Sequence, residues 1–139
     1  DYHSALEEVS RTLKPGGLFV LSVPRYWPER ICWALSHDYQ HEPGGHVRIF
    51  KKGALRLEVE RLGFHALASH GAHALHSPYW WLKCMNWDRR DSWLPVRLYH
   101  RFLLWDMFKA PRMTRYLEKT LNPIAGKSVT LYFDKVIAS

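Results

Sequence analysis

The segment that decides the expected fold is Leu13-Lys14-Pro15-Gly16-Gly17-Leu18-Phe19-Val20-Leu21-Ser22-Val23. Proline cannot continue a helix, and glycine accepts the positive φ of a helix end, so a helix over residues 4–14 should stop at Pro15. Residues 18–23 are almost wholly apolar, which is typical of a strand buried on both faces of a parallel sheet. The segment therefore predicts a helix, a tight turn and a core strand of an α/β protein.

The rest of the chain alternates between helical and strand patterns. Apolar residues recur at helical spacing over residues 4–14, where Ser4 and Glu7 have the spacing of a capping box, and over 52–62, which Gly63 follows as a cap. Residues 64–72 and 129–137 are predicted strands, and residues 24–45 an irregular loop. Further helices are predicted from Ser77-Pro78, from Pro95, and over residues 116–121.

Composition places the chain among folded, basic proteins of one domain. It has 139 residues, 47 % of them hydrophobic, which suits a single hydrophobic core. There are 20 Lys and Arg residues against 13 Asp and Glu, a formal net charge of +7, and seven tryptophans. A basic, aromatic-rich protein of this size is expected to have an anionic partner, either nucleic acid or a lipid surface.

The cysteine pattern and the length of the apolar stretches indicate in which cellular compartment the protein is expected. Cys32 and Cys84 form no C-x-x-C motif, so neither a disulfide framework nor a thiolate zinc site is predicted, and a reducing setting fits. The apolar stretch 98–108 is interrupted by Arg101 and Asp106 and is shorter than the roughly 20 residues of a membrane span. We therefore expect a cytoplasmic protein, with peripheral membrane association left open. The chain starts at Asp1 without methionine, so we expect the natural protein to start further upstream.

Four pieces of sequence, in this order, resemble the carboxyl half of a class I S-adenosylmethionine-dependent methyltransferase of type 11. They are Glu8-Val9 through Leu13-Lys14-Pro15-Gly16-Gly17-Leu18, then His46-Val47-Arg48-Ile49-Phe50, then Leu62-Gly63-Phe64, and the closing residues 129–135. The resemblance covers most of the chain outside a tryptophan-rich insertion.

This resemblance implies an α/β, three-layer, incomplete Rossmann-like half-sheet within a single domain of residues 1–139. Its three strands would be the family's fifth, sixth and seventh, the last one antiparallel between the other two, with a helical insertion at about residues 77–127. The edge of strand 18–23 would then lack the family's fourth strand, and proteins rarely leave an apolar edge open. We therefore expect a homodimer through this edge; the alternative is that a loop or the amino-terminal segment covers it.

The resemblance also implies S-adenosylmethionine as the cofactor of the full-length enzyme. In that family a glycine-rich loop after the first strand and an acidic residue after the second hold the cofactor, and both lie in the amino half. Here Gly16-Gly17 follows a helix and Gly44-Gly45 follows a loop, so neither pair opens a helix after a strand. We expect no cofactor-binding residue in this chain and no activity from it alone, so whether it is itself an enzyme stays open.

The acceptor that the resemblance implies is a small apolar or amphipathic molecule. The loop after strand 18–23 lies at the sheet edge where open α/β folds bind ligands. The predicted substrate-binding residues are Tyr26, Trp27, Arg48, Tyr79 and Trp80. His46 is the candidate catalytic residue, because a histidine there can accept a proton while Arg48 holds an anionic group. The alternative is that His46 caps the following helix and Arg48 forms a structural ion pair.

Nine histidines invite a metal hypothesis, which the spacing does not favour. His70, His73 and His76 recur every third residue, and on a strand His73 would face opposite to the other two. We expect no carboxylate or thiolate beside them to complete a tetrahedral set. We therefore predict no metal site.

The insertion interleaves aromatic and basic side chains over residues 79–115. This is the make-up of an interfacial helix pair whose rings lie at the level of lipid headgroups. Three interpretations stay open: the rings are ordinary core over the sheet, they contact an anionic lipid surface or lipid-like substrate, or they stack on nucleic acid bases. Nucleic acid is the least favoured, because the charge is not gathered into a long basic stripe. The rival to the methyltransferase is thus a non-catalytic module that binds an anionic surface.

Overall fold

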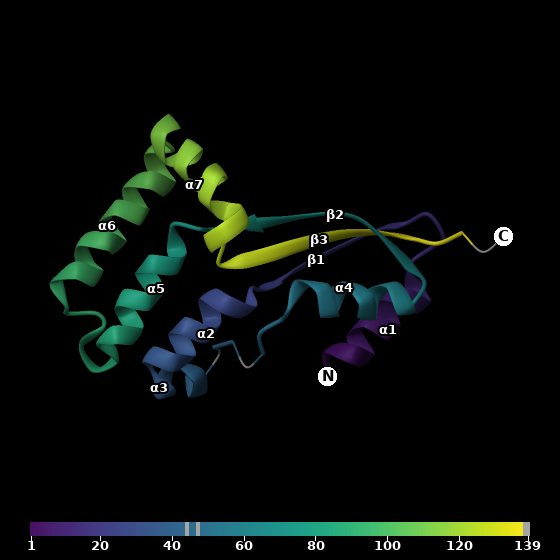
Figure 1. The fold of residues 1–139 in the computed structure, drawn as a ribbon, viewed down its shortest axis with the longest axis horizontal. Coiled ribbons are helices and arrows are strands. Elements are labelled where there is room, and N and C mark those ends of the chain that lie inside the picture. Colours follow the sequence, from purple (N-terminus) through teal and green to yellow (C-terminus); the bar gives the residue numbers. More distant parts are fainter. Residues whose placement is uncertain (44, 47, 138–139) are drawn as a thin grey trace.

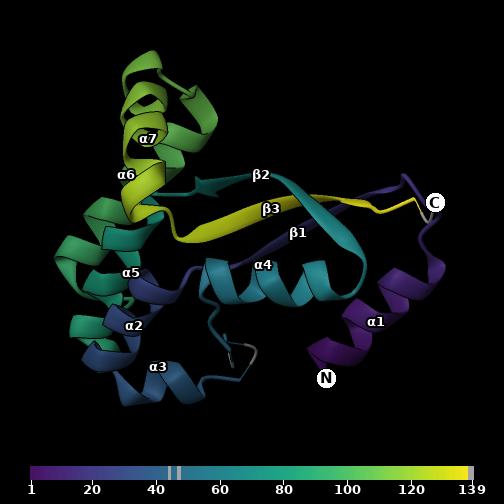
Figure 2. The ribbon, with the colours of Figure 1, turned by 45° about the vertical axis from the view of Figure 1, so that its right-hand side comes forward.

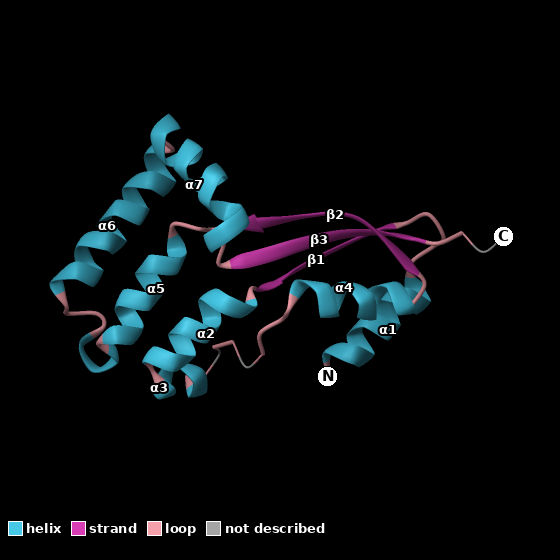
Figure 3. Ribbon diagram, in the orientation of Figure 1, coloured by secondary structure: helices cyan, strands magenta, loops and turns pink. Residues whose placement is uncertain are grey.

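The computed structural model of this chain describes residues 1–43, 45–46 and 48–137. Within them it has a three-stranded sheet and seven α-helices, with a short 3-10 helix at Trp87–Arg89 (Figures 1 and 3). The α-helices are α1 (Tyr2–Thr12), α2 (Tyr26–Leu35), α3 (His37–His41), α4 (Lys52–Arg61), α5 (His76–Met85), α6 (Leu94–Lys109) and α7 (Arg112–Ala125). The strands are β1 (Leu18–Pro24), β2 (Phe64–Ala72) and β3 (Ser128–Lys135).

The sheet has the order β1-β3-β2, and β3 runs antiparallel to both neighbours. The expected position and direction of the last strand are therefore confirmed. Val129 pairs with Val23 and Leu131 with Leu21, so apolar side chains of β1 and β3 share one face. On the β2 side the register shifts between Ala66 and Ala68, which marks a β-bulge.

Strand β1 is an edge strand, so the expectation that it is buried on both faces is wrong. Phe19, Leu21 and Val23 contribute to the core, whereas Leu18 and Val20 alternate with them and stay 59 % and 47 % exposed. The physical reason is that β1 pairs on one side only, with β3, and no element of the described chain covers its outer face there. At the carboxyl end the free edge is partly covered, because the Phe50 N–H donates to the Pro24 carbonyl at 3.4 Å.

Helices α1 and α4 cover one face of the sheet (Figures 1 and 2). Leu6 of α1 and Leu55 and Val59 of α4 are buried against Phe133 and other strand residues, which makes this the main core. Helices α5, α6 and α7 stand at one end of the sheet instead of forming a continuous layer on its other face (Figure 2). The expected three-layer arrangement is therefore not formed over Leu18 and Val20, although the α/β class is.

Capping and glycine motifs in the sequence predicted some helix ends correctly and others wrongly. Helix α4 ends at Arg61 and Gly63 has φ +85°, so the predicted glycine at this helix end is confirmed. Helix α1 starts earlier than expected, because Asp1 caps it by accepting from the His3 N–H at 3.2 Å. The Ser4 and Glu7 capping box is therefore not the start of this helix.

The region predicted as an irregular loop, residues 24–45, is mostly helical. It contains α2 and α3, and Gly44 of the predicted glycine pair lies outside the described residues, as does Val47. Pro28 did not break α2, because it lies in the first turn, where the backbone N–H groups need no intrahelical partner. Cys32 of α2 and Tyr39 of α3 pack with Cys84 of α5 in a second core cluster.

The insertion forms α5, α6 and α7, but its helix ends differ from those predicted. Helix α5 starts at His76, and the expected cap Ser77 is instead buried and donates to the Ala125 carbonyl at 2.7 Å. Helix α7 begins at Arg112 instead of Tyr116 and continues through Pro123. Carbonyls at its carboxyl end accept hydrogen bonds from the Arg25 guanidinium and the Trp27 indole, which gives this end partners outside the helix.

Helix α6 exposes much of its apolar surface. Val96 and Leu103 are its buried residues, whereas Leu94, Leu98 and Trp105 are exposed. Among the described helices, none is both long enough and apolar enough to cross a membrane.

Candidate active site

A buried carboxylate lies in the helix that follows β1. Glu29 is in the first turn of α2, shortly after the carboxyl end of that strand, and its side chain has no exposed surface. A carboxylate so placed must have positively charged or hydrogen-bonding partners, because an isolated buried charge is very costly.

Three side chains from different parts of the chain supply these partners. The Tyr39 hydroxyl donates to Oε2 of Glu29 at 3.0 Å, and Nδ1 of His46 lies 3.2 Å from Oε1. The ammonium group of Lys127 also contacts Oε1 in a buried ion pair. Lys127 reaches this point because β3 starts beside the end of β1, where the Arg25 N–H donates to the Lys127 carbonyl at 2.9 Å.

These partners keep the carboxylate ionised. Burial acts to raise the pKa of Glu29, but the hydrogen bond from His46 and the charge of Lys127 outweigh it and hold the pKa below its usual value. Burial, followed by the charge of Glu29, raises the pKa of the Tyr39 hydroxyl, so Tyr39 remains a neutral donor.

Two thiols adjoin the ion pair. The hydrogen bond from Cys84 is the largest influence on Cys32 and lowers its pKa, while burial acts against it and the charge of Lys127 assists. The Lys127 ammonium lies 3.6 Å from the Cys32 sulfur. The same hydrogen bond, together with burial, raises the pKa of Cys84, which is the donor. Both cysteines are buried, so these thiols belong to the packing around the ion pair.

His46 connects the buried carboxylate with the surface. Its side chain is 44 % exposed although its partner has no exposed surface. A carboxylate at Nδ1 favours the tautomer with the proton on Nδ1, which leaves the lone pair on Nε2 free to accept a proton. The pair therefore has the chemistry of a histidine base that is oriented by a carboxylate.

His46 lines a pocket of about 420 Å³ between the segment after α3 and the first part of the insertion. Aromatic walls come from Tyr39, Trp80 and Trp87, and the rings of Tyr39 and Trp87 meet edge to face at 5.4 Å. Charged side chains surround the opening, and the Arg90 guanidinium lies 4.1 Å from the Trp87 ring centroid. An apolar or amphipathic molecule with a polar group near His46 suits such a lining.

The predicted site residues do not all come together. His46 and Trp80 line the pocket just described, but Tyr26 and Arg48 line a different pocket of about 380 Å³, with Tyr2. Arg48 lies over the Tyr2 ring at 4.5 Å.

Trp27 and Tyr79 occupy packing positions. Trp27 donates to the Ile124 carbonyl and lies 5.8 Å from the Trp81 ring, and Tyr79 stacks with Tyr99 and His100. Neither residue lines the pocket that contains His46.

The alternative interpretation of His46 and Arg48 is not borne out either. The helix that follows, α4, has Lys51 at its cap position without a side-chain cap hydrogen bond, so His46 does not cap it. Among the described residues, Arg48 forms a cation–π contact with Tyr2 and has no ion pair.

The sequence pattern did not reveal Glu29, Tyr39 or Lys127. A usable signal existed for Glu29, because it is the sole acidic residue of the aromatic-rich stretch 24–35. No comparable signal marks Lys127, which follows Gly126 ahead of β3 and meets Glu29 only through the sheet topology.

The glycine pairs do not form a cofactor cradle. Gly16 and Gly17 lie in the turn at the amino end of β1, and a β-carbon on Gly17 would lie 2.8 Å from the Leu13 side chain and the Lys14 carbonyl. Gly17 is therefore required by a tight turn. A β-carbon on Gly45 would lie 3.0 Å from the Glu42 carbonyl, again within a local turn. The expectation that no residue of this chain binds S-adenosylmethionine stays a prediction.

No protein-family model matches this chain, and the curated proteins contain no match.

Proposed function

We propose that this chain is the acceptor-binding part of a class I S-adenosylmethionine-dependent methyltransferase. The observation that carries the proposal is the sheet, in which β3 runs antiparallel between β1 and β2. The resemblance implies this order for the family's fifth, seventh and sixth strands. In such a Rossmann-like sheet β1 would pair with a fourth strand, and its outer edge over residues 18–23 has no partner in the described chain.

The site lies where this topology would place an acceptor. His46 and Glu29 follow the carboxyl end of β1, the edge at which open α/β sheets bind ligands. The aromatic rings of the pocket would hold a small apolar or amphipathic acceptor, and Nε2 of His46 would accept the proton of its hydroxyl or amino group. Glu29 is a positioning residue, because it contacts His46 and not the acceptor.

The methyl donor would be held by residues outside this chain, since the described glycines form no cradle for it. The first test is therefore calorimetric titration of this chain with S-adenosylmethionine, for which we expect no binding in the micromolar range. A micromolar dissociation constant would overturn this placement of the cofactor site. The second test is the gene sequence upstream of the Asp1 codon, where a glycine-rich strand-loop-helix is expected.

The decisive test is methyl transfer by a protein that joins that upstream segment to this chain, assayed with labelled S-adenosylmethionine and a panel of apolar alcohols, phenols and amines. We expect transfer to at least one class. His46→Ala should lower kcat by about 100-fold or more, the lower range for a general base, while cofactor binding is retained. His41→Ala, an exposed histidine outside the pocket, is the matched control. Absence of transfer to the whole panel would reject the proposal.

A second candidate function rests on the outer surface of the insertion. Leu94, Leu98, Trp105 and Phe108 are exposed on α6 at helical spacing. Arg97 and Arg101 line a surface pocket together with Leu94 and Leu98, so basic and apolar groups adjoin. This arrangement favours an interfacial helix on an anionic lipid surface.

Vesicle co-sedimentation tests this second function. The chain should bind vesicles that contain phosphatidylserine at low salt, bind less at high salt, and ignore vesicles of phosphatidylcholine alone. Phe108→Ala should weaken binding, whereas Leu57→Ala, which removes another exposed apolar side chain on α4, should not. Equal binding by both variants would show that the chain adsorbs to vesicles non-specifically, and would reject this function.

A further inference from the structure

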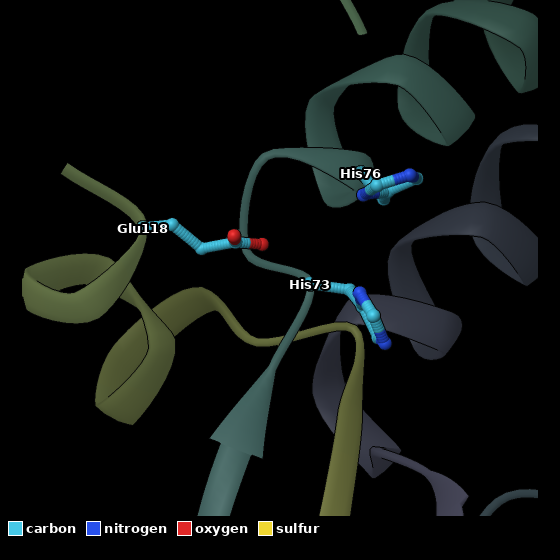
Figure 4. Close-up of side chains that lie close together, drawn as sticks. All are labelled: His73, His76 and Glu118. Carbon is cyan, nitrogen blue, oxygen red and sulfur yellow. The ribbon is translucent and has the colours of Figure 1, made fainter. Parts of the chain in front are cut away.

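Three side chains with metal-binding atoms converge at the junction of β2, α5 and α7. His73 lies in the turn after β2, His76 is the first residue of α5, and Glu118 is in the middle of α7 (Figure 4). One potential ligand atom from each lies within 4.8 Å of the others. The expectation that no carboxylate lies near these histidines is therefore wrong, because α7 folds back and brings Glu118 to them.

The histidines also differ from their expected strand geometry. Strand β2 ends at Ala72, so His73 is not on a strand, and its φ of +62° turns the chain sharply. Positive φ is uncommon for a residue with a β-carbon and is found most often where the surroundings impose it. This turn places the rings of His73 and His76 with centroids 5.4 Å apart.

None of these three side chains has a hydrogen-bond or ion-pair partner among the described residues, and Nδ1 of His76 is buried without one. Imidazole binds a metal ion through an unprotonated ring nitrogen, and no described group competes for Nδ1 of His76. A carboxylate oxygen of Asp106 on α6 is also buried without a partner, which adds negative charge near this group.

We propose that His73, His76 and Glu118 bind a divalent transition-metal ion of the zinc class. Two imidazoles and one carboxylate suit Zn²⁺, whereas Mg²⁺ and Ca²⁺ take oxygen ligands. Ligand atoms around tetrahedral zinc lie roughly 3.4 Å apart, so the side chains must close by up to about 1.4 Å, which torsions of the exposed His73 and of Glu118 can supply. The fourth position would take water.

The bound ion would join α7 to the turn between β2 and α5. The neighbours Arg115 and Lys119 on α7 are cations, which weakens attraction of a metal ion, so we expect micromolar affinity instead of the much tighter binding of closed structural zinc sites. The site is separate from His46 and does not depend on the methyltransferase proposal.

Competition titration with a chromophoric zinc chelator tests the proposal on the whole chain. We expect one Zn²⁺ per chain with a micromolar dissociation constant, and no competition by millimolar Mg²⁺. Cobalt(II) bound in place of zinc should give the intense visible absorption of four-coordinate cobalt. Zinc should also raise the melting temperature, because it binds the folded state.

Two ligand variants and a matched control separate this site from others. Glu118→Gln keeps the side-chain shape, and His73→Asn tolerates positive φ, so both should fold with unchanged melting temperature in the absence of zinc. Each should weaken zinc affinity by about 100-fold. Loss of the hydrogen-bond partner of a metal ligand already costs about 10- to 100-fold, so loss of the ligand itself should reach the upper end of that range. His41→Gln removes one of two stacked histidines of α3 and should leave affinity unchanged. Zinc affinity that survives both ligand variants, or that is lost in His41→Gln, would overturn the proposal.

Discussion

Nδ1 of His46 lies 3.2 Å from the carboxylate of Glu29, a side chain that is completely buried while His46 is partly exposed. The charge of the carboxylate is balanced inside the protein by Lys127, which arrives from the far end of the sequence with β3. The sheet thus brings the two charges together, because β1 ends at Pro24, shortly before Glu29, and the antiparallel β3 begins beside it, directly after Lys127.

Glu29→Gln should destabilise the chain by about 3–5 kcal/mol, because it leaves the buried ammonium of Lys127 without a compensating charge. Urea denaturation gives the free energy of unfolding. The double variant Glu29→Gln with Lys127→Met should regain most of the loss, since both charges are then gone. A double variant as unstable as the single one would show that the ion pair is not the cause. Glu7→Gln, at an exposed position of α1, is the control.

The stability of the chain should fall in acid partly through Glu29. Its folded-state pKa is lowered, so its contribution is fully present above the unfolded pKa of about 4.3 and is lost as pH falls through the lower folded value. Wild type and Glu29→Gln should therefore differ most above about pH 5 and converge below pH 4. Thermal or urea denaturation over this range measures the difference. Parallel curves would contradict a lowered pKa.

Gly71→Ala should destabilise the chain by about 1–3 kcal/mol or more, the range for overpacking. A β-carbon at Gly71 would lie 2.1 Å from the Asn122 carbonyl oxygen, so α7 would have to move away from β2. Gly53→Ala is a matched control, because its β-carbon meets no atom within 4 Å and alanine should stabilise α4 by up to about 1 kcal/mol. A Gly71→Ala variant that unfolds at the same urea concentration as wild type would contradict this close approach of α7 to β2.

Self-association through the outer edge of β1 stays a prediction. The edge is unpaired over residues 18–23, and the adjacent side chain of Val20 is 47 % exposed. We expect a concentration-dependent dimer in sedimentation velocity and a monomer for Val20→Lys, because like charges would face each other across the paired edges. Leu57→Lys, an exposed change on α4, should still dimerise. A wild-type monomer at high concentration would rule out this mode of pairing.

The tryptophans of the insertion should differ in their effect on stability. Trp80 packs against the buried cluster of Cys32, Tyr39 and Cys84, so Trp80→Ala should cost about 3–5 kcal/mol. Trp105 is 43 % exposed and touches Phe102 at a centroid distance of 6.0 Å. Trp105→Ala should therefore cost less than about 1.5 kcal/mol, the contribution of an aromatic pair. Equal losses for the two variants would contradict this division between core and surface.

Sequence alone determined the features that depend on neighbouring residues. The helix ending before Gly63, the strand over residues 64–72 and the apolar strand after Gly17 follow from periodicity, β-propensity and the backbone freedom of glycine. The family resemblance added the antiparallel position of the last strand. Helix starts were less predictable, because Asp1 and Ser77 bind partners that a spacing rule does not identify.

Tertiary structure decided which side chains form sites. His46 was singled out from the sequence, but its partner Glu29 and the balancing Lys127 come together only when β3 pairs with β1. The spacing of His73 and His76 in the sequence did not favour a metal site. In the folded chain, α7 packs beside the end of β2 and brings Glu118 close to both histidines. Local periodicity records which face of an element is apolar, whereas contacts between distant charges depend on how elements pack. For that reason the outer face of β1 and the apolar stripe of α6, both apolar enough for a core, are exposed.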